Sequence, residues 1–272
     1  MPAPKQVLVS GGFDDIKSRD IRFLEGASKL GAVTVLLWPD AALERLTGNP
    51  PKFPLAERSY FLNAVRFVTK VIEADPVGDF NALPKGLRPD VWADYEPVAN
   101  TAREQSARQH GIFYRVFGAE DLKGFPEPPL NPFTPGRKRV IVTGCYDWFH
   151  SGHVRFFEEV SARGDLIVCL GHDANIRKLK GENHPLLSHN ERRYLVGSIK
   201  FVTQSLICTG HGWVDAEPEI LRLKPDIYAV NEDGDKGGKR EYCANMGLQY
   251  LVLKRIPAPG LPRRNSTDLR GF

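Results

Sequence analysis

An order of features that occurs twice dominates this sequence. An apolar run, a Gly-Gly-Phe-Asp turn (residues 11–14) and a second apolar run fill residues 5–37, and the same order fills residues 139–170, with Gly-Cys-Tyr-Asp at 144–147. The spacing between matched residues grows slowly, from 133 (Asp14 to Asp147) to 134 (Arg58 to Arg192) and 136 (Asp90 to Asp226). Such repetition predicts two copies of one structural unit.

The repeated pattern also predicts the fold class. Short apolar runs that alternate with helical patterns are typical of βαβ units, so each copy is expected to be an α/β, Rossmann-like domain with a parallel sheet. Residues 126–135 hold five prolines, which predicts an extended linker. We therefore expect domains at residues 1–125 and 138–272, joined by a linker at 126–137. A different α/β fold for residues 1–125 is the alternative.

Composition narrows the function classes. The net charge of +4 fits an anionic small molecule as well as nucleic acid. No apolar run approaches the roughly 18 residues of a membrane span, and the N-terminus lacks the pattern of a signal peptide. The four cysteines form no CxxC pair, which predicts reduced thiols and a cytoplasmic protein. All four cysteines and six of the seven histidines follow residue 140, so we expect the chemistry there.

The strongest local signal is a pair of histidines after the predicted strand 139–143. His150 and His153 flank Gly152, and Ser151 is the predicted N-cap of a helix. The inward face of that helix is expected to carry Val154, Phe157 and Val160. A helix N-terminus attracts phosphate, and a glycine allows close approach to the backbone. The pattern therefore predicts a phosphate site, with ordinary polar loop residues as the alternative.

Tyr146-Asp147 followed by His150-Ser-Gly-His153 resembles the HxGH motif of the nucleotidyltransferase superfamily, in its cytidylyltransferase-like branch. That branch includes cytidylyltransferases for glycerol 3-phosphate, choline phosphate and ethanolamine phosphate, and a heptose-phosphate adenylyltransferase. Four further segments resemble the family's other motifs in order: a lysine-bearing loop (175–182), a glutamate-arginine helix (188–195), a strand that ends near base and ribose (224–233) and an Arg…Ser-Thr motif (264–268). The resemblance implies two HUP-type domains arranged as a pseudo-dimer.

The resemblance also implies roles for individual residues. The catalytic groups are expected to be His150, His153, Lys180 and Arg192. The nucleotide-binding residues are expected to be Cys145, Tyr146, Asp147, Gly152, Lys178, Asn231, Asp233, Arg263, Arg264, Ser266 and Thr267, and Arg255 competes with the two later arginines for the triphosphate. No residue is assigned to a metal, because Mg²⁺ is expected to travel with the triphosphate. A solvated loop for the two lysines and a surface ion pair for Arg192 are the alternatives.

The implied reaction transfers CMP from CTP to a small phosphorylated alcohol, polyol or sugar and releases pyrophosphate. An adenylyltransferase that uses ATP and a nucleotide-binding regulatory protein without turnover are the rivals. A fragment of an aminoacyl-tRNA synthetase is disfavoured, since a KMSKS-like loop and a basic tRNA-binding domain are absent from the sequence. The expected partners are the nucleotide and the phosphorylated acceptor, without nucleic acid, and a homodimer stays open.

The first copy lacks the groups that handle phosphate. Lys17 and Asp20 stand where the second copy has the two histidines, and Arg19 stands where it has Gly152. Thr47 stands in the place of Lys180. A carboxylate at the helix start repels a triphosphate, because like charges disfavour binding. We therefore expect residues 1–125 to be a degenerate copy without activity.

Overall fold

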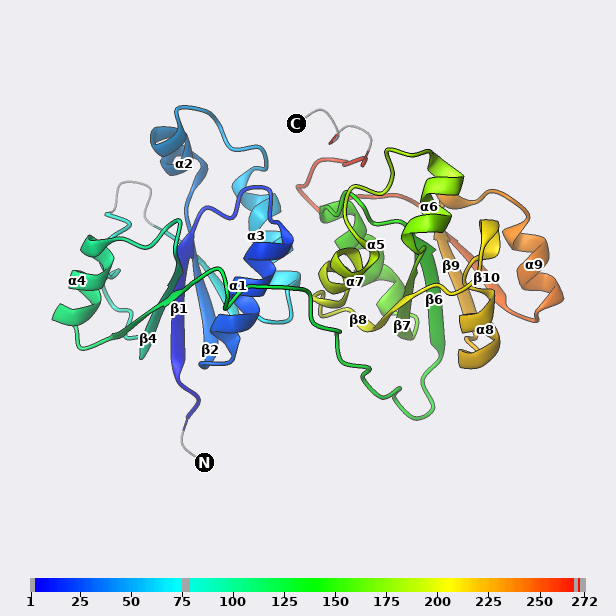
Figure 1. Cartoon of the computed structure of the whole chain (residues 1–272), viewed down its shortest axis with the longest axis horizontal. Coiled ribbons are helices and arrows are strands. Elements are labelled where there is room, and N and C mark those ends of the chain that lie inside the picture. The colour runs from blue at the N-terminus through cyan, green and yellow to red at the C-terminus, as the bar shows by residue number, and fades with distance from the viewer. Residues whose placement is uncertain (1–2, 75–78, 267–268, 270–272) are drawn as a thin grey trace. The chain divides into compact units, whose positions relative to one another are not determined.

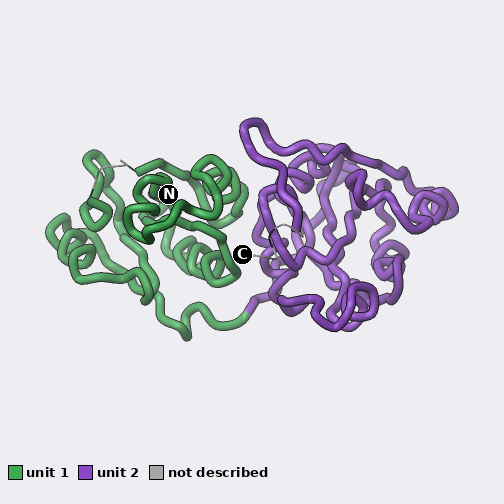
Figure 2. The backbone as a smooth tube through the Cα atoms, turned by 90° about the horizontal axis from the view of Figure 1, so that it is seen from above, with its two compact units in different colours: residues 1–124 green, residues 125–272 purple. Residues whose placement is uncertain are grey.

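The computed structural model describes residues 3–74, 79–266 and 269. The chain forms two compact units, unit 1 (residues 1–124) and unit 2 (residues 125–272) (Figure 2). Each unit contains one five-stranded parallel sheet, with the order β3-β2-β1-β4-β5 in unit 1 and β8-β7-β6-β9-β10 in unit 2 (Figure 1). The two orders are the same, so the predicted fold of two Rossmann-like α/β domains is confirmed.

Unit 1 alternates strands and helices. Its elements are β1 (Gln6–Gly11), α1 (Ser18–Ser28), β2 (Ala32–Leu37), α2 (Asp40–Thr47), α3 (Leu55–Ala64), β3 (Lys70–Glu73), β4 (Val91–Tyr95), α4 (Thr101–Gln109) and β5 (Phe113–Phe117). Compared with the described part of unit 1, unit 2 repeats this order with helix α8 and two 3₁₀ turns added. Its elements are β6 (Arg139–Gly144), α5 (Ser151–Ser161), β7 (Asp165–Leu170), α6 (Asp173–Lys180), α7 (His189–Gly197), β8 (Val202–Ile207), η1 (Gly212–Val214), α8 (Glu217–Leu223), β9 (Ile227–Asn231), η2 (Glu232–Gly234), α9 (Lys239–Asn245) and β10 (Gln249–Leu253).

The core of unit 2 lies on both faces of its sheet. All six residues of β7 are buried, as expected for a central parallel strand that is covered on both sides. On one face, Tyr228 and Val230 of β9 pack in a cluster with Ile220 of α8 and Cys243 of α9. The predicted inward face of α5 is confirmed, since its three members, Val154, Phe157 and Val160, are fully buried.

A glycine closes the first crossover of each unit. A Cβ atom on Gly31 would lie 2.1 Å from the carbonyl oxygen of Lys5, and one on Gly164 would lie 2.3 Å from that of Lys138. No side chain fits at either distance, so both positions require glycine. The same device at the same place explains why the first helix of each copy is followed by a glycine in the sequence.

The proline-rich segment, which the sequence predicts to be an extended linker, packs along unit 2. Asn131 accepts a hydrogen bond from the Gln204 side chain at 2.8 Å, and Phe133 packs against the α8–α9 core cluster. Arg137 forms an ion pair with the buried Asp165 at 3.0 Å. Prolines keep the segment extended, yet its polar and aromatic residues attach it to β7 and β8. None of the described helices is long and apolar enough to cross a membrane.

Candidate active site

A cavity of about 510 Å³ lies at the carboxyl edge of the unit 2 sheet. It opens beside β6 and β9, where the chain reverses the direction in which it adds strands, which is the usual ligand site of such sheets. Five segments line it: the end of β6 with the loop after it and the start of α5, the end of α6 with the loop after it, the end of β9 with the loop after it, the start of α9, and the C-terminal segment. The sequence-predicted residues among the lining are Cys145, Tyr146, Asp147, Gly152, His153, Lys180, Asn231, Asp233, Arg263 and Ser266.

His150 caps helix α5. Its ring atom Nδ1 accepts a hydrogen bond from the Gly152 amide at 3.0 Å, so the predicted N-cap Ser151 is wrong by one residue. An imidazole nitrogen can accept the orphan amide as a hydroxyl does. Because Nδ1 is the acceptor, the proton of the neutral ring is on Nε2. That nitrogen lies 3.4 Å from Oγ of Ser266, in the C-terminal segment.

The two histidine rings are neutral at neutral pH. Burial, aided by the charges of Arg255 and Arg264, lowers the pKa of His150 to about 3. Burial and the neighbouring His150 ring hold the pKa of His153 well below its usual value. The ring centroids are 4.0 Å apart and stacked. The pair can therefore offer N–H donors to a ligand, while positive charge has to come from other side chains.

Lysine and arginine side chains supply that charge. The predicted lysine loop is helix α6, and its last residue, Lys180, lines the cavity. Lys180 forms no ion pair with any described residue, so its charge is available to a ligand. Lys178 is exposed and lies outside the lining, which favours a solvated position for it.

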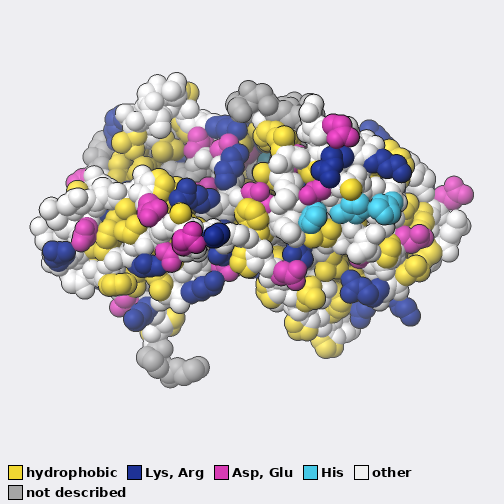
Figure 3. Space-filling model, viewed as in Figure 1, with side chains coloured by type: hydrophobic (Ala, Val, Ile, Leu, Met, Phe, Trp, Pro, Cys, Tyr) yellow, Lys and Arg dark blue, Asp and Glu magenta, His cyan; other side chains and the backbone are white. Residues whose placement is uncertain are grey.

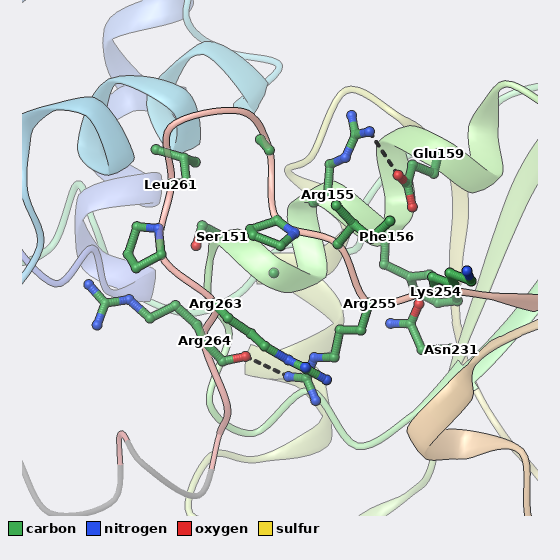
Figure 4. Close-up of a pocket in the computed structure, with 15 residues that line it drawn as sticks. Ser151, Arg155, Phe156, Glu159, Asn231, Lys254, Arg255, Leu261, Arg263 and Arg264 are labelled. Carbon is green, nitrogen blue, oxygen red and sulfur yellow. Dashed lines mark hydrogen bonds and ion pairs between the residues drawn. The ribbon is translucent and has the colours of Figure 1, made fainter.

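The structure separates the three competing arginines. Arg255 and Arg263 line the cavity, and their guanidinium groups converge in the close-up of the adjoining crevice (Figure 4). Arg264 points away from them, and its carbonyl oxygen accepts a hydrogen bond from Arg255 at 2.6 Å (Figure 4). Arg255 also forms an ion pair with Asp233. Arg264 lines the adjoining crevice but not the cavity, and its side chain is not directed at the point where Arg255 and Arg263 converge.

Arg192 lies behind the cavity, not in its lining. Its side chain is fully buried, and it donates to the carbonyl oxygens of Cys145, Gly171 and Leu187 and to the carboxylate of Asp173. Arg58 of unit 1 makes the matching set of bonds, to Gly12, Trp38, Phe53 and Asp40. Since the copy without histidines keeps the whole arrangement, the arginine holds loops together in both units. Its predicted contact with phosphate does not fit this geometry.

Asp147 also makes contacts that are repeated in unit 1. Its carboxylate accepts hydrogen bonds from the backbone amides of Leu186 and Leu187 at 2.9 Å. Asp14 in unit 1 accepts from the matching amides of Lys52 and Phe53. Asp147 lines the cavity, yet its oxygens are already occupied by the fold, as they are in the other copy.

Three further predicted residues also line the cavity. Asn231 ends β9, and Cys145 and Tyr146 form the loop after β6. Burial raises the pKa of the Cys145 thiol, which disfavours a thiolate there. Thr267 lies outside the described residues. The described residues include no group of three or more histidine, cysteine or acidic side chains that could hold a metal ion.

Several lining residues escaped the sequence analysis. They include Thr143, Trp148, Phe156, His184, Lys239 and Asn265. Most carry no pattern that a single sequence reveals. Lys239 is different, because it matches Arg103 of unit 1 at the spacing of 136 found for Asp90 and Asp226, so the repeat itself held the signal. Histidine side chains gather over unit 2 in the space-filling view (Figure 3), and His172 and His211, in contact at 3.3 Å, lie outside the cavity.

Unit 1 has larger side chains at the matching positions. Arg19, at the position of Gly152, lies over the ring of Tyr95 with its Cζ 5.6 Å from the centroid. Tyr95 itself stands at the position of Asn231. Asp20, at the position of His153, accepts a hydrogen bond from the backbone amide of Lys17 at 2.8 Å. Two lining residues of unit 2 are thus replaced by a bulky pair that stacks.

Comparison with known proteins places unit 2 in a defined group. The family model described as "Cytidylyltransferase-like" matches residues 141–241. FAD synthase of Korarchaeum cryptofilum is 30% identical over 129 residues, which cover 45% of this chain and 84% of that protein. Bifunctional protein HldE of Aliarcobacter butzleri is 40% identical over 124 residues, which cover 44% of this chain.

This match covers only 25% of the length of the HldE protein. Among solved structures, the lipopolysaccharide core biosynthesis protein from Thermoplasma volcanium aligns over 48% of this chain and 100% of its own, with 21% identity and a TM-score of 0.38.

Proposed function

Because this chain belongs to the cytidylyltransferase-like family of nucleotidyltransferases, we propose that unit 2 transfers CMP from CTP to a small phosphorylated alcohol, polyol or sugar and releases pyrophosphate. One observation carries the proposal: the neutral imidazole of His153, on which the His150 ring is stacked, and the unpaired ammonium group of Lys180 line one cavity at a helix N-terminus. Such a site suits phosphates in reaction.

The chemistry needs little acid–base help. An oxygen of the acceptor phosphate attacks the α-phosphorus, a new P–O bond forms, and the bond to the β-phosphate oxygen breaks as pyrophosphate leaves. The second pKa of a phosphomonoester is about 6, so the attacking group is already mostly a dianion at neutral pH. No general base is required. The protein has to position the two phosphates and stabilise charge that moves towards pyrophosphate.

The geometry gives each side chain a role in that task. His150 is expected to donate from Nε2, and His153 to donate beside it, to oxygens of the α-phosphate. Lys180 is expected to neutralise the same group. Arg255 and Arg263 converge on one point and suit the leaving β- and γ-phosphates, because a planar guanidinium binds phosphate oxygens in pairs. Arg192 acts through the loops that it holds.

Mg²⁺ is proposed to enter with the triphosphate. Two carboxylates line the cavity, and both have partners: Asp147 binds two backbone amides and Asp233 pairs with Arg255. Phosphate oxygens and water are therefore the main ligands that we expect for the ion. Its charge would help to neutralise the triphosphate.

ATP is the alternative donor. The FAD synthase relative, of which this chain covers 84%, is named for a product that contains an adenine nucleotide. That name favours adenylyl transfer to a phosphorylated acceptor, whereas the description of the family model favours CTP. Neither imidazole contacts a base in the proposed arrangement, so the histidines suit both donors equally.

Unit 1 is proposed to be an inactive copy. Lys17 and Asp20 replace the two histidines, and Arg19 stacks on Tyr95 where unit 2 has Gly152 and Asn231. Burial raises the pKa of Asp20, and its carboxylate is used by the helix start. Unit 1 therefore lacks the hydrogen-bond donors and the space that unit 2 is proposed to use for the reaction.

A panel assay tests the function. The full chain is incubated with Mg²⁺, with CTP or ATP, and with a set of phosphomonoesters, and pyrophosphate release is measured. We expect release only when nucleotide and acceptor are both present, and more with CTP. Higher kcat/KM with ATP would assign the alternative donor. Tight nucleotide binding without pyrophosphate release with any acceptor would instead favour a nucleotide-binding regulatory protein without turnover.

A further inference from the structure

The two units have a cationic side chain at the same position, but its surroundings differ between them. In unit 1, Arg103 of α4 forms an ion pair with Asp94 of β4 at 2.7 Å, and each residue is only 1% exposed. In unit 2, the matching residues are Lys239 of α9 and Val230 of β9, both 136 positions later. The cation is retained, while the carboxylate that neutralised it is replaced by an apolar side chain.

Among the residues that the structure describes, no carboxylate forms an ion pair with Lys239 as Asp94 does with Arg103. The two acidic residues nearest to Lys239 in charge interaction are Asp215 and Asp235. Asp215 accepts a hydrogen bond from Asn175 at 3.0 Å, and Asp235 accepts from Tyr250 and Arg240. Within the described residues, the ammonium group of Lys239 makes one hydrogen bond, to the carbonyl oxygen of Gly234 at 3.1 Å, and no ion pair within 4.0 Å.

The lysine is also partly removed from water. Lys239 is partly buried, and burial lowers its pKa, although the two aspartates act in the opposite direction. An unpaired, partly desolvated ammonium costs free energy in the empty protein, and an anionic ligand would recover it. Lys239 lines the cavity, so a ligand there can reach it.

Strand alternation puts Lys239 on a particular side of the cavity. Neighbouring residues of a strand point to opposite faces, and Val230 packs with α8 and α9 while Asn231 lines the crevice beside α5. Lys239 is the first residue of α9, and Cys243 of that helix packs in the same cluster as Val230. The histidine donors begin at α5, on the opposite face. The cavity thus has hydrogen-bond donors on both sides of the sheet edge, neutral imidazoles on the side of α5 and the ammonium group of Lys239 on the other.

We propose that Lys239 binds the phosphate group of the acceptor, on the side of the cavity opposite α5. The anion site follows from the exchange of Asp94 for Val230, and its occupant rests on the proposed reaction. An acceptor phosphate held there would face the α-phosphate across the edge of the sheet, with Lys180 and the histidines on the far side. The nucleotide keeps its own set of donors, so the two substrates use different cations.

Binding of inorganic phosphate to the full chain tests the site without turnover. The protein is saturated with the α,β-methylene analogue of CTP or ATP, whichever binds, and phosphate is titrated by calorimetry. Lys239→Met should weaken phosphate binding by a factor on the order of 10–100, because it removes a hydrogen bond from a charged donor. Lys239→Arg should keep most of the affinity. Lys236→Met is the matched control, since Lys236 is exposed three residues away and does not line the cavity.

A second substitution restores the arrangement of unit 1. Val230→Asp places a carboxylate where Asp94 stands and should weaken phosphate binding through its pairing with Lys239, while Val230→Asn, of nearly equal size, should weaken it less. Circular dichroism confirms that each variant is folded. Unchanged phosphate affinity in Lys239→Met, no phosphate binding by the parent protein, or an equal loss of affinity for the nucleotide analogue would overturn the proposal.

The transfer assay separates the two ideas. Phosphate binding that depends on Lys239, with no pyrophosphate release from any phosphomonoester, would leave the anion site standing and remove the proposed reaction. If Lys239→Met releases pyrophosphate with the wild-type KM for the acceptor, the proposed reaction stands and the role of Lys239 in binding the acceptor is removed. If both ideas hold, the variant raises the KM for the acceptor on the order of tenfold or more and leaves the KM for the nucleotide within about threefold.

Discussion

Arg58 and Arg192 hold the same position in the two units and make the same kind of bonds, three to backbone carbonyl oxygens and one to an aspartate. In each unit, with or without the histidines, one buried guanidinium therefore holds the loops at the edge of the sheet together. This relationship distinguishes residues that maintain the fold from residues that handle phosphate.

Replacing either arginine should destabilise its own unit. Arg58→Ala and Arg192→Ala each remove the bonds to three backbone carbonyl oxygens and one aspartate, which is expected to cost about 3 kcal/mol. Urea unfolding measures the loss. Only Arg192→Ala should also lower transfer, because the loop after β6 loses its anchor. An Arg192→Ala protein of normal stability that has lost nucleotide affinity would instead place the guanidinium on phosphate.

Replacing the histidines should slow the reaction and spare nucleotide binding. Loss of one preorganised donor costs on the order of 10²–10³ in rate, so His150→Ala and His153→Ala should each reduce kcat by that factor. The exposed His110 of unit 1 offers a control, and His110→Ala should match the parent protein. Near-normal kcat in either active-site variant would remove that histidine from the mechanism.

The pH dependence of stability should reveal the buried His150. Its pKa is about 3 in the folded protein and ordinary when unfolded, so below about pH 6.5 the unfolded chain binds a proton that the folded chain excludes. The contribution of His150 to the free energy of unfolding is fully present above that pH. It falls as the pH drops, by up to about 1.4 kcal/mol per pH unit. Urea unfolding between pH 7 and pH 4.5 should show a shallower slope for His150→Asn. Equal slopes would mean that the ring protonates freely.

The rate should show no histidine titration near pH 6.5. Both rings act as neutral donors, so acidification from pH 7.5 to pH 6 should change kcat/KM only through protonation of the acceptor phosphate, whose second pKa is about 6. Rates measured with an acceptor of lower phosphate pKa provide the check, because the profile should shift with the acceptor. A profile fixed near pH 6.5 for every acceptor would indicate an imidazole that titrates.

One nucleotide should bind per chain. Calorimetric titration of the full protein is expected to give a stoichiometry of one, and Gly152→Arg, which copies Arg19 into unit 2, should abolish binding because a large side chain fills the helix start. Arg19→Gly in unit 1 should leave the stoichiometry unchanged. Two nucleotides per chain, with one lost on substitution at Arg58 or Lys17, would show that unit 1 binds nucleotide.

The repeat made much of the fold predictable, because matched apolar runs and the glycine after each first helix recur in order. The roles of the HxGH histidines and of Lys180 stay predictions, because they rest on a resemblance between motifs and not on the repeat, whose first copy lacks all three residues. What the sequence could not show was how each polar group is used. A guanidinium suits backbone carbonyls as well as phosphate, so the sequence alone does not say which of the two Arg192 binds, although the presence of Arg58 in the other copy favours a role in the fold. Lys239 was missed because the loss of its carboxylate partner becomes visible only when α9 is placed over β9.

The positions of Arg192 and Asp147 relative to the histidines have a consequence for how such a chain can change over time. The groups that close the loops form a set separate from His150, His153 and Lys180, and unit 1 keeps the first set without the second. A duplicated copy can therefore lose every residue of the second set without unfolding. Its surface is then free to acquire another use, while the neighbouring copy remains under selection for its chemistry.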